Sequence, residues 1–329
     1  MSGVVLLVTR SDDFYTVEHV AEEVARRGAT PVRVDTDRFP GQLMLTAALG
    51  SSEQPGWRYV LDTGAERVRA EDVIGVWQRR VGTPAFDDEL DPAFREGCVR
   101  ESAAALRGFL GGLAGRRFVN PPDADHAAGD KLRQLRLARE LGLDVPPTLV
   151  TNDPAEARAF FHACAARRAD VVAKMLTPLS TSMHGGSPFV HTSAVTAEDL
   201  EDLDGLRYAP MVFQERVPKA RELRVAMVAG RPYVGAIDAS GSEHGQVDWR
   251  RSRPGEVGWT PGAVPADVAE RLRRLLEALG LVYGAADLIV TPDGRHVFLE
   301  VNPGGEWGML ERDLALPIAA ALAEALVGG

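Results

Sequence analysis

Asp287, Glu300 and Asn302 have the types and the spacing of a metal site. Glu300 and Asn302 are two residues apart in FLEVNPGG (298–305), so an extended chain places both side chains on one face and Leu299 on the other. Asp287 lies in the preceding apolar run, YGAADLIV. Two carboxylates and an amide oxygen leave coordination positions open, which suits Mg²⁺ shared with substrate phosphates. Two unrelated acids on a solvated hairpin are the alternative interpretation.

A turn between the two apolar runs predicts how the acids face each other. TPDGR contains residues typical of tight turns, and this predicts a β-hairpin. With Pro292 to Arg295 as a four-residue loop, Asp287 lies opposite Glu300, and Val290 pairs with Val297. Because like charges directly opposite one another destabilise a sheet, a cation between these carboxylates is expected.

The composition argues against several classes of function. The chain has 329 residues, and its net charge is −10 with arginines scattered among acids, which argues against nucleic acid as a partner. Its two cysteines have neither metal-ligand nor disulfide spacing, as expected in a reducing cytosol. No apolar run has the length and flanks of a signal peptide or a membrane span. We therefore expect a cytoplasmic protein with no nucleic-acid or membrane partner.

The beginning of the chain has the pattern of an α/β domain. An apolar run at 4–8, a helical stretch at 17–27 and a second apolar run at 31–34 predict a β-α-β opening. It has no GxGxxG turn, so a dinucleotide site is not indicated. The string DVIGVWQRR predicts a later strand ending at Arg79 and Arg80, which either face a ligand cleft or are ordinary surface charges. The domain is expected to close at the Asn-Pro-Pro of residues 120–122.

A small second domain and an α+β third domain are expected to follow. DKLRQLRLARELGL (130–143) has helical periodicity, and strand, helix and strand patterns follow it. The Gly- and Ser-rich segment 180–187, which ends in Ser187, either folds over phosphates as a lid or is a flexible surface loop. The predicted domains are 1–120, 121–213 and 214–329.

Four features occur in a fixed order along the second and third domains. Lys131 opens the first helix, Lys174 lies in an apolar strand, the polar hinge QERVPKARE follows at 214–222, and the acidic triad comes last. A lysine in an apolar strand is costly unless its charge is used, and a phosphate would use it. Lys131 is alternatively a solvated residue in a first helical turn, and the hinge acids are alternatively solvated charges on an exposed turn.

This order of features resembles the ATP-grasp superfamily of carboxylate–amine and carboxylate–hydroxyl ligases. The resemblance implies an α/β ATP-grasp fold with a pre-ATP-grasp N-terminal domain, a central lid domain and a C-terminal α+β domain, and it implies ATP and Mg²⁺ as cofactors. The positions that it assigns to ATP are Lys131 and Lys174 at the phosphates, Ser187 in the lid loop, Gln214, Glu215 and Val217 near the adenine, and Glu222 at the ribose. It assigns Asp287, Glu300 and Asn302 to the metal.

One position departs from the superfamily pattern. Several of its ligases carry an arginine two residues before the metal-binding aspartate, where this chain has Ala285. Another arginine must then offset the charge of the transferring phosphate. Arg224, one strand step from Glu222, and Arg250 in the string DWRR are the predicted catalytic residues.

Within the superfamily, VWQRR, RELRV and DWR together look like the graspetide, or microviridin-type, peptide macrocyclases. This resemblance implies a ribosomal precursor peptide with leader and core as the partner, crosslinks from Asp or Glu to Thr, Ser or Lys, and a homodimer. Three alternatives stay open: an amino-acid ligase acting on a protein tail or a small molecule, a non-catalytic nucleotide-binding regulator, and a phosphotransferase.

Overall fold

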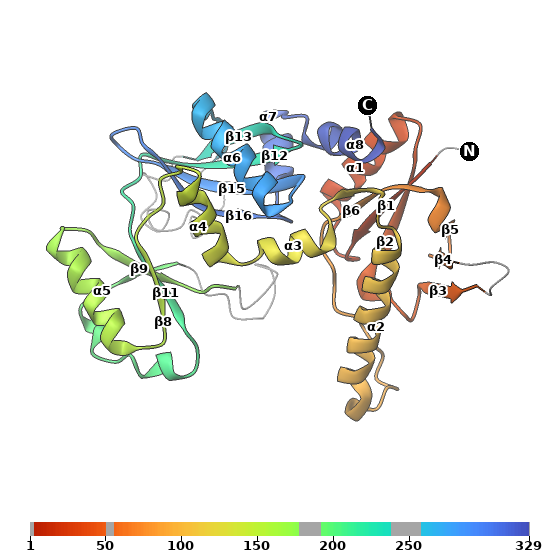
Figure 1. The fold of residues 1–329 in the computed structure, drawn as a ribbon, viewed down its shortest axis with the longest axis horizontal. Coiled ribbons are helices and arrows are strands. Elements are labelled where there is room, and N and C mark those ends of the chain that lie inside the picture. The colour runs from red at the N-terminus through yellow and green to blue at the C-terminus, as the bar shows by residue number, and fades with distance from the viewer. Residues whose placement is uncertain (1–2, 51–55, 178–191, 238–257, 329) are drawn as a thin grey trace.

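The computed structural model describes residues 3–50, 56–177, 192–237 and 258–328, arranged as three connected domains (Figure 1). The N-terminal domain (red to orange) and the C-terminal domain (blue) lie next to each other, and the small central domain (green) projects from the far side of the C-terminal sheet. The fold is of the α/β class, as predicted.

The N-terminal domain is built on a parallel sheet with the strand order β2-β1-β6-β7. The predicted β-α-β opening is confirmed, since β1 and β2 pair in parallel and α1 connects them. Because β1 is buried along almost its whole length, it has the continuous apolar sequence of a central parallel strand. The elements are β1 (Val4–Thr9), α1 (Tyr15–Arg26), β2 (Thr30–Asp35), β6 (Val73–Gln78) and β7 (Arg117–Val119).

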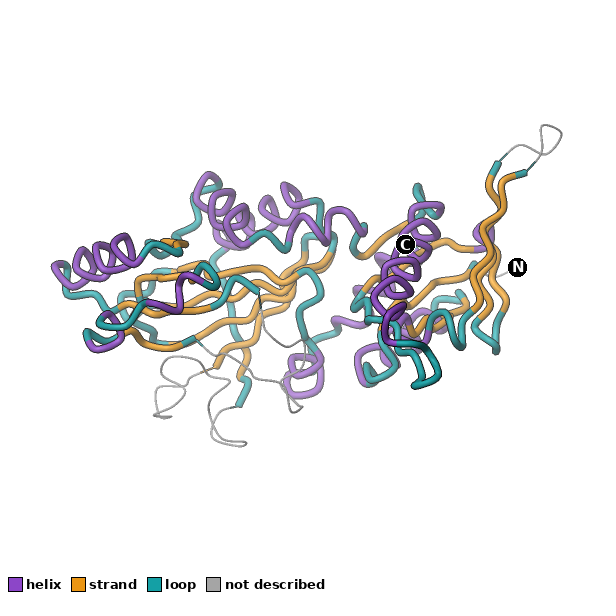
Figure 2. Tube along the Cα trace, turned by 90° about the horizontal axis from the view of Figure 1, so that it is seen from below, coloured by secondary structure: helices purple, strands orange, loops and turns teal. Residues whose placement is uncertain are grey.

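A second group of elements extends the N-terminal domain outward. An antiparallel three-stranded sheet stands at its outer edge in Figure 2, and a long helix, α2, packs against it. Its strands are β3 (Met44–Leu49), β4 (Trp57–Asp62) and β5 (Arg67–Arg69), and α2 spans Pro92–Gly112. One-turn 3₁₀ helices lie at Thr36–Arg38 and Ala70–Asp72.

The last helix of the chain completes the core of the first domain. Helix α8 (Ile318–Val327) packs on α1 and on the edge formed by β6 and β7. Its buried Leu322 and Leu326 share one hydrophobic core with Val5 and Val20. The N-terminal domain is therefore formed from both ends of the described chain.

The central domain is a four-stranded antiparallel sheet, of order β10-β9-β11-β8, covered by helix α5. Asp153 caps the predicted helix, because its carboxylate accepts the N–H of Ala155 at 2.8 Å. The elements are β8 (Thr148–Thr151), α5 (Pro154–Ala166), β9 (Val171–Lys174), β10 (Ser193–Val195), β11 (Met211–Glu215) and the 3₁₀ segments Glu198–Leu200 and Asp204–Arg207.

The C-terminal domain has a five-stranded sheet with the order β14-β13-β12-β15-β16. Alternate residues of β12 serve two cores: Leu223 and Val225 pack with α6, whereas Ala226 and Val228 face the N-terminal domain's core. The elements are β12 (Arg221–Val228), β13 (Arg231–Ile237), β14 (Thr260–Pro261), α6 (Ala266–Leu279), β15 (Tyr283–Val290), β16 (His296–Asn302) and α7 (Gly308–Leu314).

The packing of two helices differs from the predicted division at residues 121 and 214. Helices α3 (Pro122–Ala128) and α4 (Lys131–Glu140) contact α6, and Ala138 and Leu143 join the core of the C-terminal sheet. Periodicity shows that a helix has an apolar face but not which sheet covers that face. The helix carrying Lys131 is therefore held by the sheet that carries the acidic triad.

The hairpin of β15 and β16 corrects one prediction and confirms another. Val290 lies opposite His296 and not Val297, so the predicted pairing next to the turn is wrong by one residue. A β-bulge at Leu299 then inserts one extra residue into β16, and Asp287 faces Glu300 as predicted. The bulge also turns Leu299 toward the cleft that Glu300 lines, although regular alternation predicted the opposite face.

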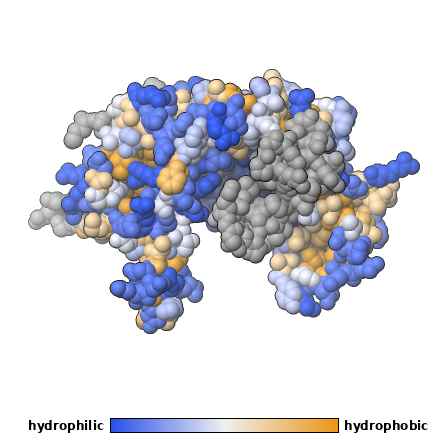
Figure 3. All heavy atoms as spheres, turned by 180° about the vertical axis from the view of Figure 1, so that it is seen from behind, coloured by the Kyte–Doolittle hydropathy of each residue, from blue (hydrophilic) through white to orange (hydrophobic). Residues whose placement is uncertain are grey.

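Among the described residues, no helix is long and apolar enough to cross a bilayer. Figure 3 shows the face opposite to that of Figure 1, where polar side chains are frequent and two lobes project from the body.

Candidate functional site

The acids of the candidate metal site lie on one face of the β12-β15-β16 sheet. Asp287 is opposite Glu300 across one ladder and opposite Arg224 across the other, and Asn302 follows Glu300 by one strand step. Ala285, opposite Asn302, is fully buried, and a Cβ placed on Gly305 would come within 2.5 Å of its methyl group. The loop at Gly305 therefore packs closely against the Ala285 side chain.

Arg224 is held by Asp287 in a bidentate ion pair. Its Nε and Nη2 donate to the two carboxylate oxygens at 2.9 and 2.8 Å, and its Nη1 donates to the carbonyl of Glu306 at 3.1 Å. Burial alone would lower the pKa of Arg224, but the Asp287 carboxylate raises it above its ordinary value. In this structure the guanidinium contacts Asp287 and the Glu306 carbonyl, which orients Asp287; the contact of Arg224 with the reacting groups stays a prediction.

Lys131 lies between the other two members of the triad. Its ammonium group is 3.0 Å from Glu300 Oε2 and donates to Asn302 Oδ1 at 3.0 Å. Helix α4 begins at this lysine because Asp130 caps the helix, accepting the N–H groups of Leu132 and Arg133. The predicted cation between the carboxylates is therefore supplied in part by the chain itself, since Lys131 pairs with Glu300 and Arg224 with Asp287.

The electrostatics keep Glu300 ionised. Burial alone raises the pKa of this carboxyl, but the positive charges of Lys131 and Lys174 outweigh burial and hold it far below its ordinary value. Lys174 therefore acts on the triad although it belongs to the central domain. Lys131, Lys174, Glu300 and Leu299 line one narrow cleft between the two domains.

Lys174 and Gln214 are linked across neighbouring strands of the central sheet. Lys174 Nζ donates to Gln214 Oε1 at 3.0 Å, and Gln214 Nε2 donates to Thr148 Oγ1 at 2.8 Å. Gln214 is almost completely buried, so this hydrogen-bonded chain sets where the ammonium group lies. That Lys174 pairs its charge with a phosphate stays a prediction.

The backbone N–H groups at the start of the hinge are paired with neighbouring segments of the central domain. β11 lies between β9 and β8, and the N–H of Glu215 donates to Pro147 O at 2.9 Å while that of Arg216 donates to Asp170 O. Within the described residues, Val217 is the first of the hinge whose N–H has no backbone partner. The side chain of Glu215 is paired with Arg167 at 2.9 Å.

Glu222 lies on the same face of β12 as Arg224 and is mostly buried. Lys219, from the hinge, donates to its Oε1 at 2.7 Å. Two predicted positions, Ser187 and Arg250, lie outside the described residues, as does the lid loop 180–187.

The N-terminal domain adds charged residues whose role the sequence analysis left open between a ligand cleft and ordinary surface charge. Arg79 is buried, donates through Nε to Asp13 Oδ2 at 2.7 Å and is ion-paired with Glu306, which also pairs with Arg80. The backbone carbonyl of Glu306 accepts a hydrogen bond from Arg224, so this charged cluster is connected to the triad. The arginines were visible at the end of VWQRR, but only the fold shows which acids they meet.

Asn120 links the N-terminal domain by hydrogen bonds to the start of β15 and to the loop that follows Asn302. Its amide nitrogen donates to the carbonyls of Tyr283 and Pro303 at 2.9 and 3.1 Å, and its Oδ1 accepts the N–H groups of Val282 and Tyr283 at 2.8 Å. Pro303 directly follows Asn302. The sequence marked this residue only as a domain boundary.

The donor set of the triad fits a hard divalent cation. Asp287, Glu300 and Asn302 present only oxygen donors, and two of them already converge on an ammonium group at 3.0 Å. The described residues contain no cluster of three His, Cys, Asp or Glu side chains, so a metal here depends on the Asn302 amide.

Comparisons with known proteins agree with this geometry. A family model described as the MvdD pre-ATP grasp domain matches residues 4–126, and a comparison with curated proteins found no match. Macrocyclase MdnB from Microcystis aeruginosa MRC is 45% identical, with a TM-score of 0.83, and the match covers 99% of this chain and 100% of that one.

Two further solved structures contain bound peptides. Macrocyclase MdnC from Microcystis aeruginosa MRC, bound with the precursor peptide MdnA, is 34% identical with a TM-score of 0.85, and the match covers 99% of this chain and 100% of that one. A RiPP-associated ATP-grasp ligase from Chryseobacterium gregarium, in complex with ADP and a leader and core peptide, is 31% identical with a TM-score of 0.88; the match covers 98% and 96%.

Proposed function

This chain belongs to the family of ATP-grasp macrocyclases and ligases that act on ribosomally made peptides, and we propose that it crosslinks side chains of a precursor peptide. In this proposal a side-chain carboxylate of Asp or Glu is activated by ATP and joined to a Thr or Ser hydroxyl as an ester, or to a Lys amine as an amide. The observation that carries it is the convergence of Lys131 and Lys174, from two domains, on the carboxylate of Glu300.

ATP is the activating substrate, because an ionised carboxylate is a poor acylating agent. The substrate carboxylate attacks the γ-phosphorus, the bond to the β–γ bridging oxygen breaks, and ADP leaves with an acyl phosphate formed. Lys131 and Lys174 are placed to offset the negative charge that develops on the phosphates. Val217 would hold the adenine through its backbone, next to Glu215 and Gln214, and Glu222 would accept the ribose hydroxyls.

The triad is proposed to hold the nucleotide's metal ion. Asp287, Glu300 and Asn302 would ligate Mg²⁺, which when bound offsets the charge of the triphosphate. Lys131 Nζ would then move from Glu300 toward a phosphate oxygen, and Arg224 would keep Asp287 in its orientation. Ser187 in the lid loop and Arg250 are also proposed to contact the phosphates.

The second step forms the crosslink. The hydroxyl or amine attacks the acyl carbon, the bond to the phosphate oxygen breaks, and phosphate leaves while the nucleophile loses its proton. Both reacting side chains belong to one peptide, so holding the peptide raises their effective concentration. The domains proposed to carry out this reaction are a pre-ATP-grasp domain at 1–120, a lid domain at 121–213 and a C-terminal domain at 214–329.

The proposed partner is a precursor peptide with a leader and a core. The MdnC structure contains the precursor peptide MdnA, and the Chryseobacterium gregarium ligase is in complex with a leader and core peptide; these two relatives motivate the proposal for this chain. We further propose a cytoplasmic homodimer that binds neither nucleic acid nor membrane, on the basis of its net charge of −10 and the base rate of dimers among soluble oligomers.

Mass spectrometry tests the proposed reaction. The probe is the synthetic full-length peptide encoded by the short reading frame beside the gene for this chain. Incubation with Mg·ATP should remove the mass of one water per crosslink and release one ADP for each. A peptide that gains phosphate would show a phosphotransferase, and transfer of free amino acids to a protein tail would show the alternative amino-acid ligase. ADP release with neither change in peptide mass would refute the proposal.

A further inference from the structure

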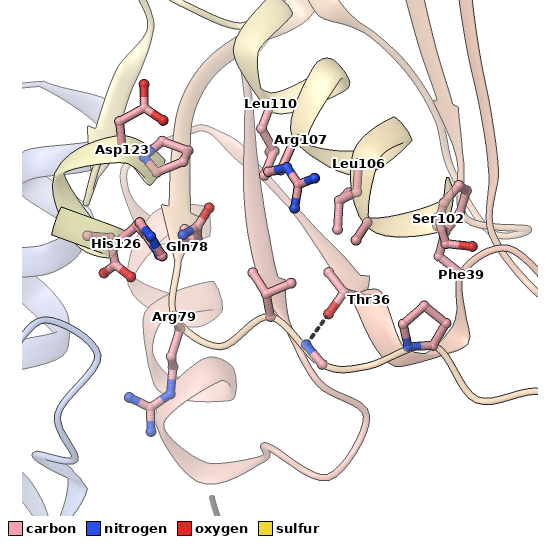
Figure 4. A pocket seen from close by; sticks show the side chains of 16 residues that line it. Thr36, Phe39, Gln78, Arg79, Ser102, Leu106, Arg107, Leu110, Asp123 and His126 are labelled. Carbon is pink, nitrogen blue, oxygen red and sulfur yellow. Dashed lines mark hydrogen bonds between the residues drawn. The ribbon is translucent and has the colours of Figure 1, made fainter. Parts of the chain in front are cut away.

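The N-terminal domain contains a cavity that the candidate ATP site does not use. Its volume is about 610 Å³, within the range of ligand pockets, and Figure 4 shows it between α2, α3 and the segment that follows β6. Leu106 and Arg107 approach it from α2, and Asp123 and His126 approach it from α3.

The cavity lies where parallel sheets commonly bind ligands. Thr36 follows the last residue of β2, Gln78 is the last residue of β6, and Pro122 begins the helix after β7. All three line the cavity, so it opens at the carboxyl ends of the parallel strands, outside which α/β proteins bind ligands. Sheet topology thus marks it as a binding position independently of its size.

Its walls carry polar side chains that the fold does not use. Within the described residues, no hydrogen bond or ion pair engages the side chains of the buried Ser102 or the half-buried Gln78, which both line the cavity. Most buried or half-buried polar groups in proteins are paired, and the fold alone leaves these two without a partner. An apolar floor with a few polar groups that have no partner is the usual composition of a ligand pocket.

The lining selects the class of ligand. Asp123 and Asp125 share the lining with Arg107 and with Arg79, and the Arg79 guanidinium is already paired with Asp13 and Glu306; this balance of charge disfavours a polyanion such as a nucleotide. Gln78 and Ser102 can each donate and accept, as peptide groups require. Phe39, Leu106 and Leu110 supply apolar surface for a side chain.

The cavity also adjoins the reaction centre. A Cβ on Gly304 would lie 2.7 Å from the carbonyl oxygen of Arg79, so the loop that follows Asn302 touches a residue of the cavity wall. The guanidinium of Arg79 is paired with Glu306, whose backbone carbonyl accepts from Arg224. The cavity wall and the triad are therefore connected through the loop that follows Asn302.

We propose that this cavity holds the segment of the peptide substrate that adjoins the reacting side chain, with its peptide groups on Gln78 and Ser102 and an apolar side chain on the floor. The inference rests on the proposed function for the peptide nature of the substrate. The inference adds where the N-terminal domain binds that peptide and which residues contact it.

A pair of tryptophan substitutions on α2 tests the inference. Ala103 lines the cavity, whereas Ala105, two residues further along the same helix, is exposed and does not. Ala103→Trp fills the cavity and should weaken binding of the synthetic peptide at least about tenfold, with the affinity for ADP unchanged. Ala105→Trp should change neither affinity. A second pair, Arg107→Glu and the surface control Arg100→Glu, alters charge without adding volume to the core.

Photocrosslinking separates this inference from the proposed reaction. Benzoylphenylalanine at position 103 should label the peptide, and the same group at position 105 should not, whether or not crosslinks form. If wild-type enzyme condenses the peptide while Ala103→Trp and Arg107→Glu bind it as tightly as their controls, the cavity assignment is overturned and the proposed function stands. If position 103 labels the peptide but its mass never falls, the cavity assignment stands and the proposed reaction fails. Protection of position 103 by a free nucleotide, and not by the peptide, also overturns the assignment.

Discussion

The ion pair of Arg224 and Asp287 should be a large contributor to the stability of the C-terminal domain. Its side chains are only 6% and 17% exposed, and two hydrogen bonds of 2.9 and 2.8 Å join them. Removing one member of a buried pair costs about 3 to 5 kcal/mol, because the other charge stays buried. Since water reaches part of Asp287, we expect Arg224→Met to lower the free energy of unfolding by about 3 kcal/mol.

Urea denaturation followed by fluorescence and circular dichroism measures this loss. In a double-mutant cycle with Asp287→Asn, the double variant should be more stable than the sum of the single effects by about 2 kcal/mol. Arg231→Met is the matched control, because Arg231 forms a bidentate pair with Glu324 on the surface, and its loss should not be measurable. Equal effects of Arg224→Met and Arg231→Met, or simple additivity in the cycle, would refute the reasoning.

Three further predictions concern the same centre. Lys131→Gln should raise the KM for ATP about tenfold in the ADP-release assay, with Arg136→Gln on the exposed face of α4 as its control; an unchanged KM would remove Lys131 from the phosphate site. The pKa of Glu300 is lowered on folding, so its stabilising contribution is complete above its ordinary value of 4.5 and is lost as the pH falls below it; Glu300→Gln should therefore abolish part of the acid sensitivity of unfolding, and an identical pH profile would contradict this. Asn120→Ala should cost about 3 kcal/mol in urea unfolding because buried backbone groups lose their partners, whereas the exposed Asn152→Ala should cost nothing measurable.

Local patterns predicted the elements around the site well. The helix that presents Lys131 could be recognised from its periodicity, and the opposition of Asp287 and Glu300 followed from the hairpin. The prediction that Asp287 faces Glu300 was correct, but the register from which it was derived was not. The pairing at Val290 is shifted by one residue, and the bulge at Leu299 restores the register. A bulge inserts one residue without a reliable sequence signal, so alternation alone could not reveal it.

The partners of charged residues were harder to predict. The spacing of RELRV placed Arg224 on the face of Glu222, yet its guanidinium meets Asp287, 63 positions further along the chain. Arg79 likewise meets Asp13 and Glu306 from distant segments. Such pairs depend on how sheets from different parts of the chain are placed side by side, and no local pattern contains that information.

The position of α8 has a consequence for how the protein is made. Residues 318–327 supply part of the core that surrounds β1, so the sheet around β1 lacks one of its packing layers until α8 has been synthesised. Its nascent form therefore exposes the apolar surfaces of Val5 and Val20 during translation. Chaperone capture should consequently be strongest for nascent chains that end just before Ile318.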